Sequence, residues 1–332
     1  MCDLVNNSGR LEYTELLKKY PWVVQRDLNC ILSPDSDGLL CGLLMQSLLN
    51  WNIVGFYDGK VMALKHGYKA SDCVFLDMEI FRNFTKSIGQ HMLIWNSKRD
   101  LQKPEWANFD NCISPNNIRK FDGKTKFKRK YPLGTIHILL GILGSRFYIQ
   151  IKQEAICPLL YTDGTFKSMF NYPENVLDWL DFLSAGDETS PLYKVFFDNT
   201  YSTSTLMKAL KNFFADIKNI GIGGKGGDKI QISDKNGNYK NFTQNINITF
   251  DLEQEQCVVA DKFLTLLSQL TGWRYDSKKW MFEDFDLFSF SKGVIVPNNR
   301  NFDALVARMP ISWAMTAGSR IEYTVEDRDV LN

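Results

Sequence analysis

Short apolar runs alternate with polar segments through the first half of the chain, and several of these runs end at an acidic residue. Residues 30–33 and 74–77 are apolar and short, so they predict buried strands. Residues 38–50 form a longer apolar run without β-branched residues, which favours a helix. Strands that alternate with helices in this way are typical of a parallel sheet covered by helices.

The same pattern predicts further elements on both sides of a change in character near residue 188. Before it, we expect helices at 8–20, 135–143 and 176–184, and strands at 53–57, 61–64 and 92–95. After it, we expect helices at 206–217 and 257–270, a hairpin within 228–251, and short strands at 294–296 and 321–325. The predicted fold is α/β: a doubly wound, mainly parallel sheet in residues 1–190, followed by a smaller α+β domain in residues 191–332, a candidate substrate-binding domain.

Two carboxylates follow the first predicted strand, after a proline that ends it. Asp35 and Asp37 are two residues apart, and side chains at that spacing in an extended segment point the same way. Ligands in open α/β sheets bind outside the carboxyl ends of strands. Paired carboxylates at such a place suit Mg²⁺ or Mn²⁺. The alternative is an ordinary polar turn, because Pro-Asp-Ser-Asp-Gly is also favourable turn chemistry.

Three more side chains with metal-ligand chemistry follow in the first 165 residues. Asp77 ends a predicted buried strand, His91 precedes the predicted strand at 92–95, and Asp163 follows a short apolar segment. A doubly wound sheet brings groups at its strand ends to one edge. We therefore expect these residues to converge with Asp35 and Asp37 in one pocket.

Composition narrows the class of protein. The 332 residues are 44% hydrophobic and 23% charged, which is ordinary for a globular chain, and the net charge of +1 leaves nucleic-acid binding to a local patch. No apolar run approaches the roughly 18 residues that span a bilayer, so no membrane partner is expected. Seven scattered cysteines without a CxxC pair indicate reduced thiols, and the first nine residues are polar; both predict a cytoplasmic protein.

A local basic patch is present between residues 119 and 131. Its cations alternate with Phe121, Phe127 and Tyr131. Such a run predicts binding to single-stranded nucleic acid, because cations neutralise phosphates and aromatic rings stack on bases. A solvated surface loop is the alternative. The candidate nucleic-acid-binding residues are Lys124, Lys126, Lys128, Arg129 and Lys130.

Residues 28–185 resemble the DHH phosphoesterase superfamily. The first motif of that family, His-x-x-Pro-Asp-x-Asp-Ala, is similar to residues 31–38, which keep the proline and both aspartates. Asp77 matches the second motif, an aspartate that ends a strand, and Asp163 matches the fourth, a lone aspartate. The third motif, Asp-His-His, is matched in part by residues 90–92. Segments similar to the Asn-Pro and Tyr-Pro-Phe elements of the RecJ-like branch lie at 114–117 and 131–134.

The resemblance implies a divalent-metal-dependent phosphoesterase that hydrolyses phosphodiester bonds in single-stranded nucleic acid or short oligonucleotides. It implies one or two Mn²⁺ or Mg²⁺ ions, with Asp77 and Asp163 contacting both, Asp35 holding the first, and Asp37 with His91 holding the second. Asp77, Asp163 and His91 would be the catalytic residues.

The chain departs from the family at three motif positions. Ile31 replaces the first-motif histidine, Gln90 replaces the aspartate of Asp-His-His, and Met92 replaces its second histidine. One metal position therefore lacks a ligand. This leaves open a catalytically degenerate DHH-like domain that binds nucleic acid, a nucleotide or a protein partner without turnover. A structural or assembly protein is a third possibility, and the distances between the acidic residues discriminate it from the others.

Overall fold

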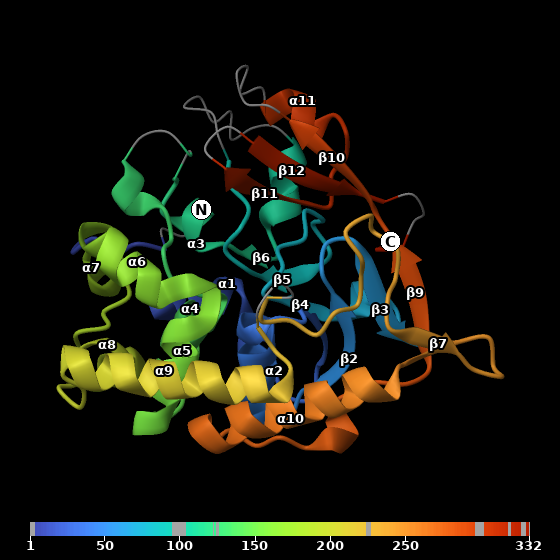
Figure 1. Ribbon diagram of the computed structural model, residues 1–332. Helices are drawn as coiled ribbons and strands as arrows, with labels where there is room; N and C mark the ends of the chain where they lie inside the picture. Colours follow the sequence, from blue (N-terminus) through green and yellow to red (C-terminus); the bar gives the residue numbers. More distant parts are fainter. Residues whose placement is uncertain are drawn as a thin grey trace.

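A nine-stranded sheet packed against helices dominates the structure, and a separate three-stranded sheet lies beyond one end of its strands (Figure 1). The computed structural model describes residues 4–94, 104–121, 123, 126–223, 227–295, 302–317, 320–326 and 330–331.

The central sheet is mixed. Its strands, in their order across the sheet, are β6 (Cys112–Ile113), β5 (Lys86–Ile88), β4 (Val74–Leu76), β1 (Asn29–Leu32), β2 (Asn52–Tyr57), β3 (Val61–Lys65), β9 (Phe285–Ser289), β8 (Phe250–Leu252) and β7 (Phe242–Gln244). The strands from β6 to β2 pair in parallel. From β2 onwards, β3, β9, β8 and β7 continue the sheet in antiparallel pairings. The predicted α/β class is confirmed.

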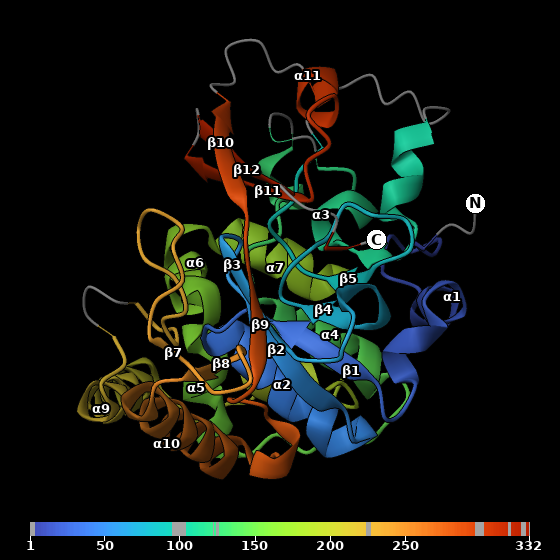
Figure 2. The same cartoon turned by 90° about the vertical axis from the view of Figure 1, so that its right-hand side faces the viewer.

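The helices connect and cover these strands. They are α1 (Tyr13–Lys19), α2 (Ser36–Leu49), α3 (Pro115–Ile118), α4 (Thr135–Gly144), α5 (Ile156–Tyr161), α6 (Thr165–Asn171), α7 (Pro173–Phe182), α8 (Pro191–Phe196), α9 (Thr203–Ile220), α10 (Gln254–Thr271) and α11 (Phe302–Val306). The predicted helices at 38–50, 135–143, 206–217 and 257–270 correspond to α2, α4, α9 and α10. In two views, α9 and α10 lie side by side beneath the sheet (Figures 1 and 2).

Alternation along β1 shows how the two faces of the sheet are covered. Cys30 and Leu32 belong to the large core formed with the helices, whereas Ile31 belongs to a second core on the opposite face. Phe290 and Ile311, from the C-terminal part of the chain, contribute to that second core. A doubly wound sheet would carry helices on both faces. In the ranges that the structure describes, the long helices pack on one face only, so this detail of the prediction differs.

The C-terminal half of the chain joins the same sheet. β9 pairs with β3 along its whole length, from Val61 opposite Ser289 to Lys65 opposite Phe285. The proposed division into residues 1–190 and 191–332 therefore crosses one continuous sheet. The small sheet is separate, with the antiparallel order β10 (Ser291–Ile295), β12 (Arg320–Val325), β11 (Ser312–Ala317).

One predicted strand is wrong. Residues 92–94 are in no strand, and Trp95 lies outside the described residues. The strand in this region is β5, which ends at Ile88, before Gln90. Residues 92–94 are apolar because they are buried in a core beneath the small sheet. Three residues of β5, two of them polar, are too few to show a strand's alternation.

Candidate metal centre

The turn after β1 places Asp35 at the start of α2. Its side chain is the N-cap: Oδ1 accepts a hydrogen bond from Gly38 N (3.1 Å), and Oδ2 accepts one from Ser33 Oγ (2.7 Å). Asp37 lies in the first helical turn, so the prediction of two carboxylates on one side of an extended segment is wrong. Aspartate is a preferred N-cap residue, and capping starts the helix immediately. The turn requires glycine, since a Cβ on Gly38 would lie 2.1 Å from the Ser33 carbonyl oxygen.

Asp37 is buried against the first turn of α4. Its carboxylate accepts hydrogen bonds from the backbone N–H groups of Thr135 (2.5 Å) and Ile136 (2.9 Å). The approach depends on Gly134, where a Cβ would lie 2.8 Å from Asp37 Oδ2. Asp37 thus joins the loop after β1 to α4, using the free N–H groups of a helix start.

Asp77 directly follows β4 and is only 1% exposed. Its Oδ1 accepts a hydrogen bond from Thr135 Oγ1 (2.6 Å) and lies 3.9 Å from His91 Nε2. Among the described residues, no hydrogen-bond donor reaches its other oxygen, Oδ2, which is fully buried. A buried carboxylate oxygen without a donor is costly unless a cation or a proton compensates it.

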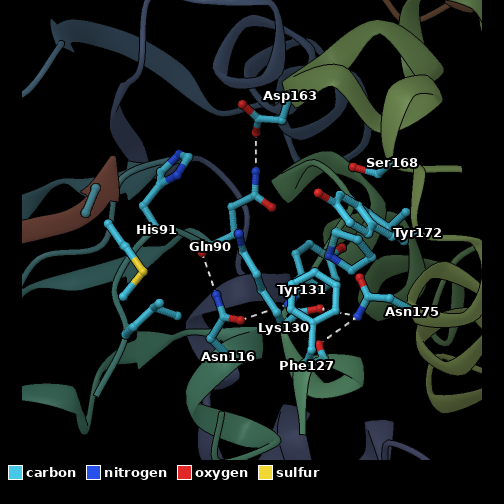
Figure 3. A pocket seen from close by; sticks show the side chains of 15 residues that line it. Gln90, His91, Asn116, Phe127, Lys130, Tyr131, Asp163, Ser168, Tyr172 and Asn175 are labelled. Atoms are coloured by element: carbon cyan, nitrogen blue, oxygen red, sulfur yellow. Dashed lines mark hydrogen bonds between the residues drawn. The ribbon is translucent and has the colours of Figure 1, made fainter. Parts of the chain in front are cut away.

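His91 and Asp163 reach the same place from different elements. His91 follows the carboxyl end of β5, and its side chain is 41% exposed. Asp163 lies between α5 and α6, not after a strand as predicted, and its backbone is left-handed (φ 48°). Gln90 joins the two segments, because its side-chain amide donates a hydrogen bond to the Asp163 carboxylate (Figure 3).

Asp77, His91 and Asp163 together form what we call the ligand cluster. Each offers one ligand atom, and these atoms lie within 4.8 Å of one another. Two carboxylate oxygens and an imidazole nitrogen are a donor set that suits Mn²⁺ or Mg²⁺. The unpartnered oxygen of Asp77 is the observation that fits a cation. Asp35 lines the same cleft, whereas Asp37 does not line it and is bonded to α4.

Electrostatics at the site also favour a cation. Burial raises the pKa of Asp77 well above its usual value, and the charges of Asp37, Asp35 and Asp163 raise it further. Burial likewise raises the pKa of Asp37, and the charge of Asp163 raises it further. The hydrogen bond from the Ile136 N–H lowers this pKa in part. Several carboxylates in one buried place cannot all ionise without a compensating charge.

Sequence reasoning missed a third buried carboxylate, besides Asp37 and Asp77. Glu79 is 1% exposed and accepts hydrogen bonds from the backbone N–H groups of His91 (2.6 Å) and Met92 (2.7 Å). It fixes the segment that carries His91. The one available signal was its position two residues after Asp77. Met92 and Ile31, the two motif departures without polar atoms, are both buried in apolar cores.

The ligand cluster opens into a cleft that also holds basic side chains. Lys229 and Lys292 line this cleft, together with Ser312 and Thr324 of the small sheet. Burial lowers the pKa of Lys292, and nearby Lys60 and Lys229 lower it further, against opposing effects of Glu322 and Asp58. An adjoining cavity contains Lys60, Lys229, Lys235 and Lys240. The cleft therefore holds both carboxylates and ammonium groups.

Lys229 is held in place by contacts to the first motif. Ser36 Oγ donates a hydrogen bond to the Asp228 carboxylate, and Ile230 N donates one to the Pro34 carbonyl (2.8 Å). A segment almost 200 residues away in sequence thus crosses the loop after β1. No local pattern in the sequence indicated this contact.

The predicted nucleic-acid-binding residues lie beside a second cavity. Lys126, Lys128 and Lys130 are exposed, Arg129 is half-buried, and Lys124 lies outside the described residues. Lys130 lines the cavity, which also contains His91 and Asp163. Phe121 and Tyr131, expected to stack on bases, are buried at 4% exposure each. Nucleic-acid binding by this run stays a prediction.

Comparisons with known proteins identified no relative of this chain. A scan against protein-family models and searches of curated proteins and of solved structures found no match to the chain. In the part of the chain that the structure describes, no helix has the length and apolar character needed to cross a membrane.

Proposed function

We propose that this chain is a divalent-metal-dependent phosphoesterase of the DHH type, nearest the RecJ-like branch, that hydrolyses phosphodiester bonds in single-stranded nucleic acid or short oligonucleotides. One observation carries the proposal: Asp77, which has a buried oxygen without a donor among the described residues, lies with His91 and Asp163 in a cleft that Lys229 and Lys292 also line. A cation held by the acidic ligands, together with ammonium groups in the same cleft, suits a phosphate ester, an anion that is attracted to both.

The ligand cluster would hold Mn²⁺ or Mg²⁺, with Asp35 at the cleft side able to contribute to a second ion. Bound there, a divalent cation supplies Lewis-acid stabilisation of phosphoryl charge and a hydrolytic water of lowered pKa. The residues of the chain provide the rest. Lys229 and Lys292 bind and orient the phosphate, Gln90 orients the Asp163 carboxylate, and Thr135 orients that of Asp77.

A cleavage assay on short single-stranded oligonucleotides with Mn²⁺ tests the function. Asp77→Asn should reduce turnover by at least about a hundredfold, because a neutral amide cannot balance a cation. Asp72→Asn, an exposed aspartate outside the cleft, is the matched control and should keep full activity. Unchanged turnover in Asp77→Asn would contradict the proposal.

Binding without turnover is the second candidate, and a specific observation favours it. Both oxygens of Asp37 are occupied by backbone N–H groups of α4, and Ile31 offers no ligand atom. A second ion therefore has few donors. Wild-type protein that binds Mn²⁺ and oligonucleotide but cleaves none would establish this candidate in place of the first.

A further inference from the structure

The second cavity beside the ligand cluster has the composition of a base-binding site. It has a volume of about 250 Å³ and shares His91 and Asp163 with the cleft. A group bound in it therefore lies next to whatever the cluster holds. Figure 3 shows Gln90 and Asp163 on one side of this cavity and Tyr131 and Phe127 on the other.

Two aromatic side chains at this cavity are unusually exposed. Phe127 is 44% exposed and Tyr172 is 47% exposed, and their ring centroids are 5.1 Å apart in an edge-to-face arrangement. Tyr131 lines the cavity from below, and its ring packs edge-to-face on Trp179 in the core. Large aromatic rings left in solvent beside a polar site are typical of a surface that stacks on a planar ligand.

The segment that carries Phe127 is held firmly. The side-chain amide of Asn175, on α7, donates hydrogen bonds to the carbonyl oxygens of Phe127 (3.1 Å), Lys128 (2.9 Å) and Lys130 (2.8 Å). These hydrogen bonds fix the backbone that carries the exposed ring. A surface that is already ordered loses less conformational entropy when it binds a ligand.

The same segment is tied to the metal-site loop by one side chain. Asn116 accepts a hydrogen bond from Tyr131 N (2.8 Å) and donates one to the Gln90 carbonyl (2.6 Å). The position of the aromatic rings is thereby fixed relative to the ligand cluster. Ser168 and Lys130 add polar groups at the edge of the cavity.

We propose that this cavity binds the nucleobase of the nucleotide whose phosphate lies at the ligand cluster, with Phe127 and Tyr172 as the stacking residues. The inference rests on the proposed function and names the part of the substrate that gives it specificity. Stacking accepts every base, because each has an aromatic face, whereas the small volume admits one base at a time.

Calorimetric titration of the full chain with Mn²⁺ present tests the base site. The probes are adenosine monophosphate, as its 5′ and 3′ isomers, and ribose 5-phosphate, which lacks the base. Wild type should bind the tighter adenosine isomer about tenfold or more tightly than ribose phosphate. Tyr172→Leu and Phe127→Leu should each remove most of that preference and leave ribose phosphate affinity unchanged.

The matched control is Phe170→Leu, an aromatic residue 62% exposed on α6 that does not line the cavity. It should keep the wild-type preference. Three outcomes would overturn the inference: wild type binds both kinds of probe equally, it binds no adenosine monophosphate, or both cavity variants keep the preference. The oligonucleotide cleavage assay is read separately. If the protein cleaves oligonucleotides but shows no base preference, only the base site is contradicted. If it shows a base preference but no cleavage, only the catalytic proposal is contradicted.

Discussion

The side-chain amide of Gln90 donates a hydrogen bond to the carboxylate of Asp163, across two segments that are 73 residues apart. Gln90 occupies a position where the resembled family has a negatively charged aspartate. Its amide orients an existing ligand without adding charge. The contact thus preserves the geometry of the site and reduces its total negative charge, which determines how strongly it attracts a cation.

Restoring a negative charge at this position should strengthen metal binding. Gln90→Glu is expected to bind Mn²⁺ about tenfold more tightly by calorimetry, a typical effect for a group that contacts a metal ligand. Without metal it should lose about 1–3 kcal/mol of unfolding free energy at pH 8, because a carboxylate then faces Asp163 unpaired. Gln90→Leu, which removes the donor without adding charge, should bind Mn²⁺ more weakly. Weaker Mn²⁺ binding by Gln90→Glu would contradict the argument.

The carboxyl groups of Asp77 and Asp37 should make the metal-free protein less stable as pH rises. The raised pKa values of Asp77 and Asp37 mean that the folded state holds protons that the unfolded state releases. Their contribution to stability is present below pH about 4 and is lost as pH rises through the raised values. Denaturant unfolding at pH 5 and pH 8 measures the drop, which Asp77→Asn should reduce and Asp72→Asn should not.

Added Mn²⁺ should reverse this drop at pH 8, because a bound cation compensates the ionised carboxylates. The increase should be absent in Asp77→Asn. A wild-type protein whose stability at pH 8 does not respond to millimolar Mn²⁺ would speak against a metal at the ligand cluster.

His137 should destabilise the protein in acid. It is fully buried in α4, its Nδ1 faces the Gly134 carbonyl at 3.2 Å, and burial lowers its pKa to about 4. The unfolded chain protonates near pH 6.5 and the folded chain does not, so stability falls as pH falls between these values. Relative to His137→Gln, wild type should lose about 2–3 kcal/mol between pH 7.5 and pH 4.5. A difference that stays constant over this range would show that the ring has the same pKa in the folded and unfolded chains.

Gly134 should be needed for both stability and metal binding. A Cβ there would meet Asp37 Oδ2 at 2.8 Å and Thr162 Oγ1 at 2.6 Å. Gly134→Ala is therefore expected to cost about 1–3 kcal/mol, the usual range for overpacking, and to weaken Mn²⁺ binding. Gly186→Ala is the control, because its Cβ would meet nothing closer than Phe197 at 3.9 Å. Denaturant melts and calorimetry of both variants measure the effect, and equal stability would refute it.

The lysines of the cleft should carry the salt dependence of oligonucleotide binding. Replacing Lys229 and Lys292 with Gln should reduce the slope of log affinity against log salt by roughly 0.7 for each phosphate that these lysines neutralise. Replacing Lys126, Lys128, Arg129 and Lys130 together tests the basic run in the same way. Lys208→Gln with Lys211→Gln, two exposed positions on α9, is the control. Slopes that fall in proportion to the number of cations removed in all three variants, the control included, would indicate binding by net charge alone.

Much of the α/β fold was predictable from the sequence, because it depends on local patterns. Burial on one or both faces leaves a periodic signal, so the helix at 38–50 and the strand before Asp77 were found. β5 was missed, since three residues carry no period. Helices on both faces were expected from the alternation of strands and helices, but the second face is filled by C-terminal residues such as Phe290, which no local pattern assigns to it.

The sequence by itself determined which residues carry metal-ligand chemistry, because aspartate and histidine in an apolar neighbourhood are visible as residue types. Only the tertiary structure decided how they are used. It bonded Asp37 to α4, placed Asp163 after a helix, joined Gln90 to it, and brought Lys229 and Lys292 into the same cleft as Asp77 and Asp163. These relationships are hydrogen bonds and charge contacts between segments that are far apart in the chain. Such contacts have no period in the sequence, and they exist only once the packing of the sheet and helices has fixed the distances.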